Sequence, residues 1–76
     1  MTRFFFDVVR DTSSSYDFHG RYFKDVMEAR EMAEIVSYDL ACSEKDNQDN
    51  IEVQVRDTLG QTLFSVPVLA AEAAFT

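Results

Sequence analysis

The longest regular hydrophobic pattern in the chain lies between Asp25 and Cys42 and predicts an amphipathic α-helix. Apolar side chains recur there every three or four residues, which places them on one helix face: Val26, Ala29, Met32, Ala33, Val36 and Leu40. Charged side chains occupy the opposite face: Arg30, Glu31 and Glu34. Asp25 is the predicted N-cap, and Glu28 three residues later completes a capping box.

Four stretches around this helix have the pattern of β-strands. Residues 3–10 include Phe4, Phe5 and Phe6 in a row, so both faces are apolar and the strand is predicted to be central. Residues 16–23 predict a weaker strand, interrupted by a turn ending at Gly20. The remaining stretches form a hairpin: residues 51–56 alternate strictly and residues 61–66 return, with Pro67 ending the pairing.

The element order is strand, strand, helix, strand, strand, within one domain spanning residues 1–76. It predicts an α+β fold in which one helix covers one face of a four-stranded sheet. A β-grasp-like strand order, 2-1-4-3, is favoured, and an all-antiparallel order is the alternative. The handedness rule for crossovers does not choose between them, because the helix need not join parallel neighbours.

The charge of the chain is −7 and is concentrated in its middle third. Residues 25–50 carry eight carboxylates against Arg30 and Lys45, whereas residues 1–24 carry four basic and three acidic groups. Such a chain repels a phosphate backbone, so we expect no nucleic-acid partner. We also expect no membrane span and no signal peptide, and therefore a cytoplasmic protein.

The residues able to carry chemistry are few and poorly placed for it. His19 is predicted to be a solvated turn residue, and the one cysteine, Cys42, a partly buried filler beside Asp39 and Glu44. The polar loop offers oxygen ligands but lacks the pattern of a calcium-binding loop: Asp46, Asn47, Asp49 and Asn50. We therefore expect no catalytic residue, no cofactor and no metal, and the chain is not predicted to be an enzyme.

One helix covers only one face of the predicted sheet, so the other face must be explained. Phe5, Val9 and Leu63 are expected there as an apolar patch, which is a candidate interface. A second copy of the chain is the predicted cover, and the tail through Leu69 and Phe75 is the alternative. On the back of the helix, two further apolar residues complete the candidate interface: Met27 and Tyr38.

Several stretches together resemble a family of short uncharacterised bacterial proteins known only as a domain of unknown function. They are Arg3 to Val8, Gly20, Asp25 with Glu28-Ala29-Arg30, and the later hairpin with Ile51-Glu52-Val53, Asp57, Gly60 and Val66-Pro67. The family usually has proline before the capping acid, where this chain has Lys24. The resemblance implies a small α+β domain and brings no activity, ligand or catalytic residue with it.

Two functional hypotheses follow from these observations. The first is a small non-catalytic protein-interaction domain that acts through the apolar sheet face. The alternative is an acidic regulatory inhibitor, or antitoxin-like partner, of a basic protein, because the middle third of the chain is so acidic. Binding that weakens steeply with salt would favour the second hypothesis.

Overall fold

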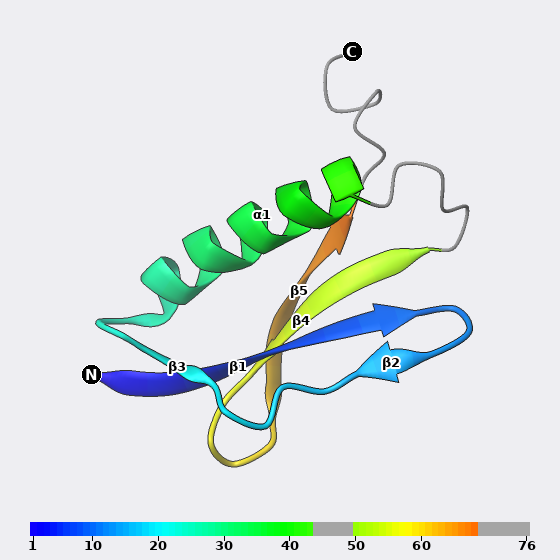
Figure 1. Cartoon of the computed structure of the whole chain (residues 1–76). Coiled ribbons are helices and arrows are strands. Elements are labelled where there is room, and N and C mark those ends of the chain that lie inside the picture. Colours follow the sequence, from blue (N-terminus) through cyan, green and yellow to red (C-terminus); the bar gives the residue numbers. More distant parts are fainter. Residues whose placement is uncertain (44–49, 69–76) are drawn as a thin grey trace.

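The computed structural model describes residues 1–43 and 50–68, which form one helix packed on one face of an open sheet (Figure 1). The elements are β1 (Thr2–Arg10), β2 (Ser14–Ser15), β3 (Arg21–Phe23), α1 (Val26–Ser43), β4 (Ile51–Arg56) and β5 (Thr62–Val68). The α+β prediction is confirmed. The predicted alternative cover by the tail through Leu69 and Phe75, and residues 44–49 of the polar loop, lie outside the described residues.

The sheet is antiparallel throughout, with the order β2-β1-β4-β5, and β3 also pairs with β1. The second predicted strand is split into β2 and β3, and the third and fourth predicted strands are β4 and β5, so the observed order in the numbering of the prediction is 2-1-3-4. The favoured order 2-1-4-3 is wrong, and the all-antiparallel alternative is correct. Burial explains the order, because β4 contributes the buried Val53 and Val55 and lies inside the sheet, next to the central β1. β5 continues through Pro67 to Val68, since an edge strand tolerates a residue without an N–H group.

Helix α1 begins as predicted, with Asp25 as its N-cap. Asp25 Oδ1 accepts a hydrogen bond from the Glu28 N–H (3.0 Å). The Glu28 carboxylate reaches back one residue further than a capping box requires, to the N–H of Lys24 (3.0 Å). The bond to Asp25 satisfies the Glu28 N–H, which the first helical turn would otherwise leave unpaired, and the bond from Lys24 ties the preceding residue to the same turn.

The buried line of the helix consists of small residues spaced four apart: Ala29, Ala33, Ser37 and Ala41. Small side chains let the helix axis approach the sheet closely, and Met32, Val36 and Leu40 pack on the flanks of this line. Val26 is exposed, contrary to prediction, because it stands at the first turn, beyond the packed part of the helix. Ser37 was not predicted as a core residue, and its hydroxyl donates to the Pro67 carbonyl (2.9 Å).

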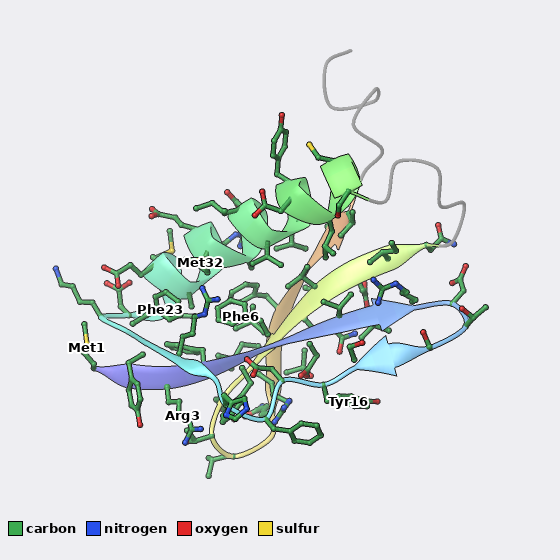
Figure 2. All side chains as sticks on the ribbon, viewed as in Figure 1. Met1, Arg3, Phe6, Tyr16, Phe23 and Met32 are labelled. Atoms are coloured by element: carbon green, nitrogen blue, oxygen red, sulfur yellow. The ribbon has the colours of Figure 1, made fainter. Side chains whose placement is uncertain are left out.

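The core lies between the sheet and the helix, where aromatic rings from β1 and β3 meet. Figure 2 shows Phe6 and Phe23 in this layer, and their ring centroids are 5.7 Å apart in an edge-to-face arrangement. Phe4 adds a second contact with Phe23 at 6.2 Å. The opposite face of the same strand β1 carries Arg3, Phe5 and Asp7, and it is this face that leads to the candidate site.

Candidate functional site

Residues 16–20 interrupt the second strand between β2 and β3, and Asp17 fills the gap that this leaves beside β1. Asp17 Oδ2 accepts the N–H of Phe6 (3.2 Å), which lies between the part of β1 that pairs with β3 and the part that pairs with β2. Asp17 Oδ1 accepts the N–H groups of His19 and Gly20, both at 3.0 Å. Partial burial acts to raise the pKa of Asp17, but these three N–H groups outweigh it and hold the pKa below its ordinary value.

Asp7 and Arg56 join this segment to the sheet in a network that we call the clasp: Asp7, Asp17 and Arg56. Arg56 donates to Asp7 through Nε (2.7 Å) and a terminal nitrogen (3.2 Å), and the hydrogen bond to Asp7 raises the pKa of Arg56. The Asp17 N–H donates to Asp7 Oδ1 (2.9 Å), and Arg56 donates to the Asp17 carbonyl (2.9 Å). Asp7 is only 2% exposed, so every bond that it accepts is shielded from water.

Phe5 lies on the same face between two guanidinium groups. The Arg3 and Arg56 guanidinium carbons lie 4.9 and 4.8 Å from its ring centroid. Arg3 also donates to the His19 carbonyl (2.7 Å from Nε), which holds it in place. Sequence patterns alone do not reveal this arrangement, because Arg56 is far from Phe5 along the chain.

Gly20 is the point where the segment comes closest to β1. Its φ is +72°, and a Cβ atom there would lie 2.9 Å from the Phe4 carbonyl oxygen and 3.0 Å from the Phe5 ring. Only glycine accepts both the backbone angle and the contact. The predicted turn ending at Gly20 is therefore confirmed. It lets the segment that carries Asp17 pack closely against β1.

The predicted sheet-face interface is divided rather than continuous. Phe5 and Val9 are half-buried and Leu63 is exposed. Phe5 on β1 and Leu63 on β5 are separated by β4, which carries Arg56. Val9 lies at the other end of the sheet, in a groove of about 380 Å³ that it shares with Pro67 and Val68. Whether any of the three contacts a partner stays a prediction.

Three aromatic side chains stand out from the interrupted strand, and we call them the aromatic edge: Tyr16, Phe18 and Tyr22. They are 60%, 80% and 62% exposed. Figure 2 shows Tyr16 on the side of the sheet away from α1. The sequence predicts an interrupted strand over residues 16–23 and does not predict that these side chains are exposed; the usable signal was Phe18 inside the polar turn that ends at Gly20.

A cleft of about 390 Å³ opens beside the same segment, and we call it the edge cleft. Seven residues line it: Phe6, Asp17, His19, Gly20, Arg21, Met32 and Val36. Phe6, Met32 and Val36 make its apolar walls, while Arg21 reaches across to the Met32 sulfur (3.7 Å). Phe18 is absent from this lining although Asp17 and His19 on either side of it belong to it.

The back of helix α1 carries the remaining predicted interface residues. Met27 is 64% exposed and Tyr38 is also exposed, as expected for residues opposite the buried line. Cys42 is exposed too, so the prediction of a partly buried filler is wrong: it lies one turn beyond Tyr38, on the outer face. A hydrogen bond with the Cys42 thiol raises the pKa of Tyr38.

His19 and Asn50, for which the sequence predicts no catalytic or metal-binding role, lie at the surface. His19 is exposed in its turn, as predicted. Asn50, the described end of the polar loop, donates from its backbone N–H to Asp11 Oδ2 (3.1 Å). Within residues 1–43 and 50–68, no cluster of three or more His, Cys, Asp and Glu side chains could hold a metal ion. Over the same ranges no helix is long and apolar enough to cross a membrane.

Comparison with protein families places the chain in one of them. The model of a domain of unknown function, DUF6894, matches residues 3–70, and the chain belongs to this family. The predicted membership of a family known only as a domain of unknown function is thereby confirmed. No curated protein matches the chain, and no solved structure matches it either.

Proposed function

We propose that this member of a family without an assigned activity is a non-catalytic protein-interaction domain. The observation that carries the proposal is Phe18, which is 80% exposed on a segment fixed by hydrogen bonds on both sides. Tyr16 and Tyr22, the other members of the aromatic edge, are also exposed. The expected contact therefore moves from the centre of the sheet face to its edge.

An exposed aromatic ring on a fixed segment favours binding for a physical reason. A flexible loop loses conformational entropy when it is ordered at an interface, whereas the clasp has already ordered the segment around Phe18. Large aromatic side chains that fill a partner's pocket supply much of the affinity of typical interfaces. Asp17, His19 and Gly20 thus position the ring, and no reactive group is needed.

The proposal is tested by comparing Phe18→Ser with Met27→Ser. Both remove an exposed apolar side chain, but Met27 lies on the back of the helix. Proteins that are retained by the immobilised parent from the native host are quantified for each variant. We expect Phe18→Ser to lose them and Met27→Ser to keep them. Equal retention by both variants would contradict the proposal.

A second candidate function, the acidic inhibitor of a basic protein, is favoured by the outer face of α1. Four exposed carboxylates lie on this helix: Glu28, Glu31, Glu34 and Asp39. A partner held by this face would bind more weakly as salt rises. The double variant Glu31→Lys/Glu34→Lys would abolish such binding, whereas contact through Phe18 would survive it.

A further inference from the structure

We infer that the aromatic edge binds a second copy of this chain, with Phe18 of each protomer inserted into the edge cleft of the other. The inference rests on the proposed function and names the partner. It differs from the sheet-face dimer expected from the sequence, because the contact is at the β2–β3 edge and not over Phe5.

The edge cleft has the size and chemistry to hold an aromatic ring. A dry cavity of ~150 Å³ is enough for a benzene molecule, and the edge cleft offers about 390 Å³. Phe6, Met32 and Val36 give the ring apolar contacts, and the Met32 sulfur is a favourable neighbour for it. Arg21, which reaches across to the Met32 sulfur (3.7 Å), has to turn aside to admit the ring and can then stack on its face.

The projecting ring and the cleft belong to the same short segment, and this points to a two-fold contact. Phe18 lies between Asp17 and His19, both of which line the cleft, while its own ring points into solvent. A two-fold axis at this segment brings each ring to the other protomer's cleft at once. A surface that presents both halves of a contact side by side is self-complementary.

Charge and area agree with this choice of partner. Residues 1–24, which contain this edge, carry four basic and three acidic groups, so two chains of charge −7 repel each other less here than through the acidic middle third. Covering the exposed parts of the three aromatic residues removes on the order of 400 Å² per protomer, about half of the ~800 Å² in a standard interface. The dimer is therefore expected to be weak, with a dissociation constant in the micromolar range.

Sedimentation of the full chain from about 10 µM to 1 mM, a range that brackets weak complexes, is the first test. We expect the parent to pass from monomer to dimer, and Phe18→Ser to raise the dissociation constant about tenfold or more. Leu59→Ser is the matched control, because Leu59 is 88% exposed in the turn between β4 and β5. This control should dimerise like the parent.

Nuclear Overhauser effects in a sample mixed from labelled and unlabelled chains locate the contact. We expect intermolecular signals from the Phe18 ring to the Met32 and Val36 methyl groups. A parent that stays monomeric, a dimer that Phe18→Ser leaves unchanged, or signals across β5 or Phe5 instead would each overturn the inference. Loss of host proteins by Phe18→Ser together with a monomeric parent would reject the homodimer while supporting the proposed function.

Discussion

The two faces of the central strand β1 are stabilised in different ways. Toward the helix, Phe4 is buried among Phe23, Val53 and Val55, and contacts between apolar groups suffice. Away from the helix, Asp7 is just as well buried, but it depends on Arg56 and on the backbone of Asp17. One face needs volume and shape, and the other needs a complete set of hydrogen bonds.

Within residues 1–43 and 50–68, this difference explains how a sheet packed against one helix can present a polar opposite face. Exposing Phe5 and Leu63 together as an apolar patch would be unfavourable. The guanidinium groups of Arg3 and Arg56 cover the Phe5 ring, and they remain well solvated themselves. The hydrogen bonds of the clasp also hold residues 16–20 against β1. The polar face therefore has a structural role, and it also fixes the aromatic edge.

The largest expected effect separates the two faces directly. Val53→Asp places an unpaired charge at a fully buried site on the helix side, so we expect the cooperative unfolding transition to be lost. Ser65→Asp introduces the same charge at an exposed residue of β5 on the opposite face, and should leave the chain folded. Thermal unfolding followed by circular dichroism checks both. A folded Val53→Asp variant would show that the helix side is not the core.

Breaking the clasp should come next in size. Asp7→Ala leaves the Arg56 guanidinium half-buried without its carboxylate, and we expect a loss of about 3 kcal/mol, at the lower end for a buried pair because Arg56 keeps some contact with water. The exposed pair of Arg30 and Glu34 is the control, and Glu34→Ala should cost less than about 0.5 kcal/mol. Urea denaturation measures both, and similar losses would mean that the clasp contributes little.

The two glycines with positive φ provide a matched pair. Gly20→Ala combines an unfavourable backbone angle with contacts of 2.9–3.0 Å to Phe4, Arg3 and Phe5, so we expect a loss of about 2–3 kcal/mol. Gly60 has a similar φ of +83° and no atom within 4 Å of the added group, so Gly60→Ala should cost about 1 kcal/mol. If the free energies of unfolding fall equally, residues 16–20 do not press against β1.

The sequence predicted what depends on short-range pattern and missed what depends on long-range pairing. The helix, its Asp25 cap and the alternation of Val53 with Gln54 follow from spacing alone, and the structure has them. The bond between Asp7 and Arg56 joins residues 49 positions apart, and no local pattern marks it. The strand order was wrong for the same reason, because the neighbour of β1 is chosen by contacts such as this one.

The smallest effect concerns acid and the carboxylate of Asp17. Its pKa in the folded chain is below the ordinary value of 3.8, because backbone N–H groups stabilise the charged form. A carboxylate of this kind stabilises the fold above the unfolded pKa, and the contribution is lost as pH falls through the folded pKa. The melting temperature of the parent should therefore fall below about pH 4.

Asp17→Asn removes this titration but keeps one oxygen for the N–H groups. The variant should start from a lower melting temperature at neutral pH and lose less of it between about pH 4 and pH 2. Glu31→Gln removes the same charge from the outer face of α1 and is the control, expected to follow the parent's curve. Should Asp17→Asn instead lose stability in acid as steeply as the parent, then other carboxylates dominate. In that case the clasp is held by Asp7 and Arg56 alone, and the segment that carries Phe18 would be less firmly fixed than its hydrogen bonds indicate.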